Sequence, residues 1–143
     1  MILKIDTGKK DIIKIIIEKN GDILISKEKR ADYDQAEILL PFIHDILREK
    51  KIDLSEITKI QVENKGDSFT SLRIGIITAN ALGYALGIEV EDFEGKNTSF
   101  KQNKDKMNHE VRQGVPRVES ALGQKISLVA PAYNKEPNIT VKK

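Results

Sequence analysis

Few side chains in this sequence combine the residue type and the spacing that catalysis requires. His44 and His109 are the two histidines, and neither stands at a Ser-His-Asp or metal-ligand spacing from other suitable groups. The chain has no Cys, which excludes thiolate catalysis, disulfides and cysteine-ligated metals. We therefore expect no catalytic residue, no metal site and no cofactor, and we expect His44 to be a solvated residue on the polar arc of a helix.

Asp6 and Asp67 are the carboxylates whose positions invite a chemical interpretation. Asp6 ends a short apolar stretch, where it could face a metal or phosphate or could cap the Thr7-Gly8 turn, and we favour the turn. Asp67 lies in a loop whose one glycine is Gly66. A phosphate cradle needs several glycines so that backbone N–H groups converge on the anion, and a carboxylate repels it. The loop is therefore a weak candidate for nucleotide binding.

The composition is that of a globular domain with an uneven charge. The 143 residues carry a net charge of +2, but residues 1–93 hold 14 basic and 17 acidic side chains, whereas residues 94–143 hold 10 and 5. This length suits one domain with an appendage. The charged start lacks a signal-peptide pattern, and no apolar run approaches the roughly 18 residues that span a bilayer. We expect a cytoplasmic protein with no membrane contact.

Three short strands precede the first helix. Ile2–Asp6, Ile12–Glu18 and Asp22–Lys27 are rich in Ile, which favours buried strands. Asn20-Gly21 between the second and third is a strong hairpin signal, because a type I′ turn needs positive φ at both central positions. We predict a three-stranded meander with Ile23 and Ile25 on one face.

The next elements are two long helices with more apolar surface than one sheet needs. The first is capped by Asp32 or Asp34, runs to about Lys51 and has an apolar arc of roughly 200°. Pro41 lies inside it and should kink it or mark a change of turn. The second, Ser71–Leu86, is apolar nearly all round, apart from one stripe of Arg73, Asn80 and Tyr84 and an opposite Thr78. A helix that is apolar nearly all round is buried nearly all round.

Shorter elements connect and follow these helices. Asp53–Glu56 has the pattern of a capping box, 59–63 and 88–93 alternate as strands, and Gly87 ends the second helix. Beyond residue 94 the sequence is polar, with a short helix predicted over 116–122 and a last strand or extended segment over 126–133.

The element order predicts an α/β fold. The order β-β-β-α-β-α-β gives a mixed five-stranded sheet, an actin-like (ribonuclease-H-like) half-domain. We divide the chain into this domain (1–93), a polar connector (94–125), and a closing segment with a basic tail (126–143).

Two motifs resemble those of the bacterial TsaB (YeaZ) family. The helix stretch Ala36–Pro41, followed by Ile43 and Leu47, resembles the family's "SExLLPxI…L" pattern, and Ser68–Gly75 resembles "GPGSFTGLRIG". The resemblance covers residues 1–93 in order, from Ile5-Asp6-Thr7 through Thr78-Ala79 to Ala85–Ile88. Ala130–Tyr133 is similar to the closing "PxYLR" segment, from which Asn134-Lys135 departs.

The resemblance implies an actin-like fold and a non-catalytic function. Family members are accessory partners of TsaD, which transfers a threonylcarbamoyl group onto adenosine 37 of tRNA, and an ATPase, TsaE, joins them. The implied partners are thus a TsaD-like catalytic subunit and a TsaE-like ATPase, with a homodimer when alone and tRNA contacted indirectly or weakly. This chain departs from the family in having Lys65-Gly66-Asp67 for Gly-Pro-Gly, Ser71 for a Gly, and about 32 residues where members have a second half-domain.

The two helices are the expected partner interface, because the chain has too few residues to cover them itself. The predicted interface residues are Leu39, Leu40, Phe42, Ile43, Ile46, Leu47, Leu72, Arg73, Gly75, Ile76, Ala79, Leu82, Gly83 and Leu86. The predicted motif loop is Gly66, Asp67, Ser68, Phe69 and Thr70.

Several alternatives stay open. The second helix could be an ordinary core helix, and Arg73 could be a rim contact or a plain surface residue. The chain could be a small ATP-binding relic that uses Asp6 and the Gly66 loop. It could also bind tRNA phosphates through residues 94–143, although we favour a solvated tail there.

Overall fold

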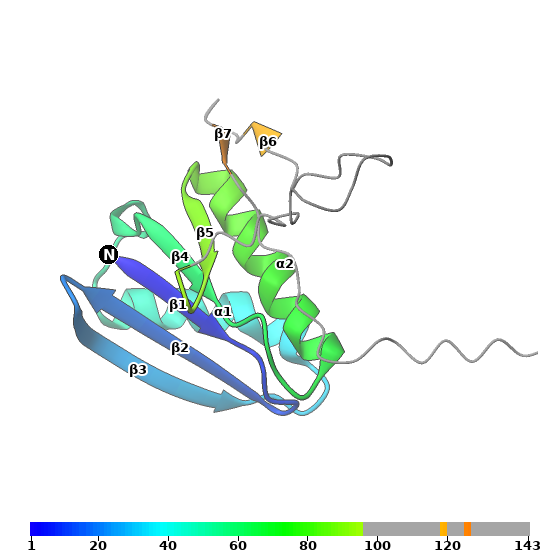
Figure 1. The fold of residues 1–143 in the computed structure, drawn as a ribbon. Helices are drawn as coiled ribbons and strands as arrows, with labels where there is room; N and C mark the ends of the chain where they lie inside the picture. Colours follow the sequence, from blue (N-terminus) through cyan, green and yellow to red (C-terminus); the bar gives the residue numbers. More distant parts are fainter. Residues whose placement is uncertain (96–117, 120–124, 127–143) are drawn as a thin grey trace, which may run out of the picture.

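The computed structural model describes residues 1–95, 118–119 and 125–126 (Figure 1). Along the chain come β1 (Ile2–Asp6), β2 (Ile12–Lys19), β3 (Asp22–Arg30), α1 (Gln35–Glu49), the 3-10 helix η1 (Leu54–Glu56), β4 (Lys59–Val62), α2 (Phe69–Leu86), β5 (Glu89–Asp92), β6 (Val118–Glu119) and β7 (Lys125–Ile126). Apart from the single turn η1, the order through β5 is the predicted β-β-β-α-β-α-β.

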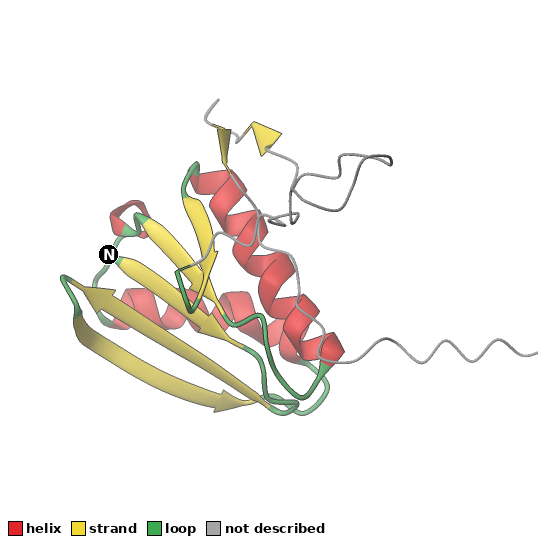
Figure 2. Cartoon of the chain, in the orientation of Figure 1, coloured by secondary structure: helices red, strands yellow, loops and turns green. Residues whose placement is uncertain are grey.

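The first five strands form one mixed sheet in the order β3-β2-β1-β4-β5 (Figure 2). Strands β1, β2 and β3 pair antiparallel, whereas β4 lies parallel to β1 and β5 parallel to β4. This arrangement confirms the predicted sheet, with a meander on one side and parallel strands on the other.

The β2–β3 hairpin confirms one prediction and corrects another. Asn20 and Gly21 have φ of 56° and 90°, as a turn with two positive φ angles requires. Ile17 pairs with Ile25 and Glu18 with Ile23, so Leu24 is an extra residue in β3. This bulge reverses the side-chain alternation. Ile25 is therefore buried while Ile23 is 63% exposed, and the prediction that both share a face is wrong.

The core lies between one face of the sheet and the two helices. The sheet contributes Leu3, Ile5, Ile13, Ile15, Ile17, Ile60, Val62 and Val90, all fully inaccessible to solvent. Helix α2 packs on β1, β4 and β5, whereas α1 packs on β2 and against α2 (Figure 1). Burying each large apolar side chain contributes roughly 1.5–3 kcal/mol, so this layer dominates the stability of the domain.

The opposite face of the sheet carries cross-strand ion pairs. Three Lys–Glu pairs bridge neighbouring strands, at 2.7, 3.1 and 2.8 Å: Lys4–Glu18, Lys14–Glu28 and Lys59–Glu91. The hydrogen bond to Glu91, together with nearby negative charge, raises the pKa of Lys59. Opposite charges across strands each contribute about 0.2–1 kcal/mol. The sheet therefore has one dry face under the helices and one charged face.

The C-terminal predictions fall mostly outside the described residues. Val118 and Glu119 form β6 and pair antiparallel with β7, so the helix predicted over 116–122 is wrong at these two positions. Pairing with a second strand provides backbone hydrogen bonds that a short isolated helical turn lacks. The remainder of 126–133 and the boundaries at 94–125 and 126–143 stay predictions. Within the described residues no helix is both long and apolar enough to cross a membrane.

Candidate protein-interaction surface

Helix α1 turns most of its apolar arc toward this chain's own sheet. Leu39, Ile43 and Ile46 are almost completely buried, whereas Leu40 points outward and is 50% exposed. The helix continues through Pro41, which lies on the exposed side. Asp34 occupies the N-cap position, but its backbone carbonyl, and not its side chain, accepts the hydrogen bonds of the first turn.

Helix α2 begins at Phe69, two residues before the predicted start. The extended residue Ser68 caps it, because its hydroxyl accepts a hydrogen bond from the backbone N–H of Ser71 at 3.3 Å. Phe69 and Thr70 therefore belong to the first helical turn. Their predicted place in the motif loop is wrong. At the other end Gly87 adopts a φ of 67°, which confirms the predicted C-terminal stop.

Two glycines predicted at the partner interface instead seat α2 on the sheet. A Cβ added to Gly75 would lie 2.2 Å from Oγ1 of Thr7, and one added to Gly83 would lie 2.3 Å from a methyl group of Val90. The Thr7 hydroxyl also donates a buried hydrogen bond of 2.7 Å to the carbonyl of Ser71. The "SFTSLRIG" motif of this chain thus fixes how closely α2 approaches β1.

Most of the other residues predicted at the interface are likewise buried. Ten of the fourteen residues are buried within this chain, where they contact its own sheet and helices: Leu39, Phe42, Ile43, Ile46, Leu47, Leu72, Gly75, Ile76, Ala79 and Gly83. The sheet and the neighbouring helix cover one side of each apolar arc, whereas Ile77 and Tyr84 of α2 stay exposed. Leu40 and Arg73 are exposed and Leu82 and Leu86 are partly exposed, and for these four the interface assignment stays a prediction.

An exposed apolar surface nevertheless remains on the side of the helices away from the sheet. We define the outer helix face as Leu40 of α1 with Ile77, Ala81, Tyr84 and Ala85 of α2, all of them exposed. Ile77 is 66% exposed. Sequence reasoning missed it, because it was grouped with the apolar arc although it lies one turn after Arg73, on the outward side. That spacing was the signal that could have found it.

A groove runs beside this face, between α1, η1 and α2. It encloses about 350 Å³. Its walls are mainly apolar, and His44, Arg48 and Asp53 supply the charged and polar groups. The full lining consists of Leu40, Ile43, His44, Leu47, Arg48, Ile52, Asp53, Leu54 and Leu82. His44 is exposed, as predicted. The predicted capping box orders the far wall, because Asp53 accepts from the N–H of Ser55 and Glu56 accepts from the N–H of Asp53, each at 2.8 Å.

At the C-terminal ends of β1 and β4, the two loops that follow these strands contact each other. Oδ1 of Asp6 accepts the N–H of Gly8 at 2.8 Å, which confirms its predicted use as a turn cap. Gly66 packs on the Gly8 backbone so closely that an added Cβ would lie 2.3 Å from the Gly8 carbonyl oxygen. The N–H of Asp67 donates to that same carbonyl at 2.9 Å. The two loops therefore use their backbone groups on each other.

The charged side chains near the end of β5 are likewise paired among themselves. Asp92 is buried, and its carboxylate accepts from the side chain of Asn64 at 3.3 Å and from the N–H of Glu94 at 3.0 Å. Glu94 also forms an ion pair with Lys65, which raises the pKa of that amine. Among the residues that the structure describes, no group of three or more His, Asp or Glu is placed to hold a metal ion.

Comparison with known proteins finds similarity to two proteins whose names refer to tRNA modification. The family model of TsaD, tRNA N6-adenosine threonylcarbamoyltransferase, matches residues 28–92. A curated relative, the tRNA threonylcarbamoyladenosine biosynthesis protein TsaB of Buchnera aphidicola subsp. Baizongia pistaciae (strain Bp), is 31% identical over 87 residues. The match covers 61% of this chain and 38% of the relative, so the chain spans well under half of that protein's length.

Two solved structures from Pseudomonas aeruginosa share the fold. YeaZ superposes with a TM-score of 0.58 at 26% identity, covering 64% of this chain and 42% of that chain. A protein described as similar to peptidase YeaZ superposes with a TM-score of 0.59, also at 26% identity, covering 64% of this chain and 41% of that chain.

Proposed function

We propose that the described domain is of the TsaB (YeaZ) type and that the chain is a non-catalytic accessory subunit in threonylcarbamoyladenosine formation on tRNA. In this proposal its partner is a TsaD-type catalytic subunit, with a TsaE-type ATPase in the same assembly and tRNA contacted indirectly or weakly. The chain forms a homodimer when that partner is absent. It acts in the cytoplasm.

The outer helix face is the observation that carries this proposal. Leu40, Ile77 and Tyr84 are large apolar side chains exposed on neighbouring helices. The apolar groove lined by Leu47, Leu54 and Leu82 continues their surface. Exposed aromatic and aliphatic side chains gathered beside a pocket are typical of protein interfaces.

The accessory role is supported by the loops after β1 and β4, whose backbone groups contact each other. Transfer of an activated group needs donors that are available to the substrate, whereas Gly66 and Gly8 here pack on each other and Asp6 caps its own turn. The family model that matches residues 28–92 is that of a transferase, so ATP titration by calorimetry provides the check. Saturable ATP binding that is lost in Asp6→Asn would favour the enzymatic alternative.

A matched pair of charge substitutions tests the interface. Ile77 and Ile23 are almost equally exposed, at 66% and 63%, but Ile77 lies on the outer helix face and Ile23 on the β2–β3 hairpin. Neither belongs to the core, so Glu at either position should leave the fold intact. We expect Ile77→Glu to weaken binding of the cognate TsaD-type subunit roughly tenfold or more, because a charge is buried unpaired, and Ile23→Glu to leave it unchanged.

The readouts are size-exclusion chromatography with light scattering on the mixed subunits, and threonylcarbamoyladenosine content of tRNA in cells depleted of their own TsaB. Equal binding by both variants would remove the outer helix face from the proposal. Absence of any complex between the unmodified chain and its TsaD-type partner would refute the accessory role itself.

A further inference from the structure

A second cavity, on another part of the molecule, has the features of a ligand site. It encloses about 200 Å³ where the β1–β2 loop, the segment before α1 and the first turns of α2 meet. Lys10, Tyr33, Gln35, Thr70 and Ile74 line it. Most small-molecule pockets measure roughly 300–1,000 Å³, so this one suits a single ring system.

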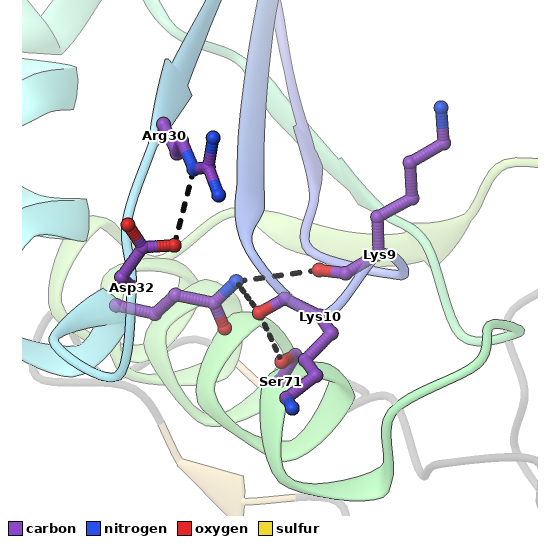
Figure 3. A network of polar contacts seen from close by, with 6 residues as sticks. Lys9, Lys10, Arg30, Asp32 and Ser71 are labelled. Carbon is purple, nitrogen blue, oxygen red and sulfur yellow. Dashed lines mark hydrogen bonds and ion pairs between the residues drawn. The ribbon is translucent and has the colours of Figure 1, made fainter.

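The walls of this cavity are held by partly buried hydrogen bonds. The side-chain amide of Gln35 donates to the backbone carbonyls of Lys9 and Lys10, at 3.3 and 2.8 Å. The hydroxyl of Ser71 donates to the Lys10 carbonyl as well, at 3.2 Å (Figure 3). Three chain segments are thus held together around the cavity, which is organised before any ligand arrives.

An aromatic ring and a cation stand at the mouth. Tyr33 is 91% exposed, and the amine of Lys10 lies 5.3 Å from the centroid of its ring. Tyr33 also has a φ of 67°, which is unusual for a bulky residue. An exposed ring beside a lysine can stack on a planar base while the amine meets its phosphate.

One buried acceptor in the wall is still available. Gln35 is only 3% exposed, and no residue in the described part of the chain donates a hydrogen bond to its Oε1. Buried polar atoms usually have partners, so an open acceptor lining a cavity favours a ligand with an N–H donor. Ile74 adds apolar surface for a ring, and Asp11 also lines the cavity.

We propose that this cavity binds one nucleotide, with the base stacked on Tyr33 and donating to Gln35 and the phosphate directed at Lys10. The nucleotide can be a free mononucleotide or an unpaired nucleotide of an RNA, because both present the same base and phosphate to the cavity. The proposal does not depend on the outer helix face, so each can fail without the other.

Binding of two probes to the full chain tests the site. Adenosine monophosphate is titrated by calorimetry, and a fluorescein-labelled unstructured oligoadenylate RNA by fluorescence anisotropy. Tyr33→Ala should weaken binding roughly 5- to 100-fold, as loss of one base–aromatic stack does, whereas Tyr33→Phe should retain it. Lys10→Gln should weaken binding and reduce the slope of log Kd against log salt by about one phosphate contact.

Two matched variants serve as controls. Tyr84→Ala removes another exposed tyrosine and Lys50→Gln another exposed lysine, and both should bind as the unmodified chain does. If the RNA binds more tightly than the monophosphate, the natural ligand is a nucleotide within RNA. If the monophosphate binds equally tightly or more tightly, the natural ligand is a free nucleotide. Absence of saturable binding of both probes at millimolar concentration, or a less than twofold change in Tyr33→Ala, would overturn the proposal.

Discussion

Replacing Gly75 by Ala tests how α2 is seated on β1. In an open position on a helix this change stabilises a protein by about 1 kcal/mol, because Ala has the higher helix propensity. Here the new Cβ would lie 2.2 Å from Oγ1 of Thr7, far inside contact distance. The Thr7 side chain must rotate, which breaks its 2.7 Å hydrogen bond to Ser71, or α2 must move off the sheet.

Three contributions determine how much Gly75→Ala changes the free energy of unfolding. Overpacking costs about 1–3 kcal/mol and a lost buried hydrogen bond about 1 kcal/mol, while helix propensity returns about 1 kcal/mol. We therefore expect Gly75→Ala to lower the free energy of unfolding by about 2 kcal/mol, measured by urea denaturation followed by far-UV circular dichroism. Thr78→Ala on the same helix removes atoms and adds none, so it creates no clash and should stay within about 0.5 kcal/mol of the unmodified chain.

A double-mutant cycle separates the clash from other effects. Thr7→Ala removes Oγ1 and the methyl group and leaves the Thr7 Cβ position 3.3 Å from the added carbon, a distance that needs only a small adjustment. In the Thr7→Ala background, Gly75→Ala should therefore cost almost nothing, which gives a coupling energy of about 2 kcal/mol. Stabilisation by the single substitution, or an equal cost in both backgrounds, would refute the close approach.

Three further predictions concern other contacts. Gly66→Ala should lower the free energy of unfolding by about 1–3 kcal/mol, because the added carbon meets the Gly8 backbone, and urea denaturation measures this. The raised pKa of Lys59 means that its pairing with Glu91 stabilises the fold below the unfolded pKa of about 10.4, and that this stabilisation is lost as pH rises through the folded pKa. The free energy of unfolding, measured from neutral to strongly alkaline pH, should show this loss. Lys59→Met should remove this part of the pH dependence. Tyr33→Gly should keep or raise thermal stability by up to about 1 kcal/mol, because glycine tolerates the positive φ, and a destabilised variant would mean that the ring stabilises the fold.

The fold was largely predictable because its signals are local. The Asn20-Gly21 turn, the Asp53 capping box and the Gly87 stop each depend on a few neighbouring residues, and all three occur as expected. The bulge at Leu24 was not predictable, because the register of β3 depends on which Ile of β2 it pairs with. Such pairing is a tertiary property that alternation alone does not encode.

The burial of the two helices was predicted less well for a related reason. An apolar arc states how much of a helix is covered, not whether the sheet or another protein covers it. Gly75 resembled a small interface residue, but it faces Thr7 within the same chain. Ile77 stands among apolar neighbours in sequence and only the packed helix reveals that it points outward. The cavity at Tyr33 joins three distant segments, so no local pattern announces it.

The central position of β1 has a consequence for the order of folding. Its antiparallel partner β2 follows within one short loop, but its parallel partner β4 places Lys59 opposite Ile2. Loop closure therefore favours the meander first and the parallel pairing later. A chain leaving the ribosome holds Leu3 and Ile5 on an unpaired strand edge until residue 62 has emerged, and such edges recruit other chains. The synthesis of β4 thus marks the point at which the nascent protein can cover the open edge of β1.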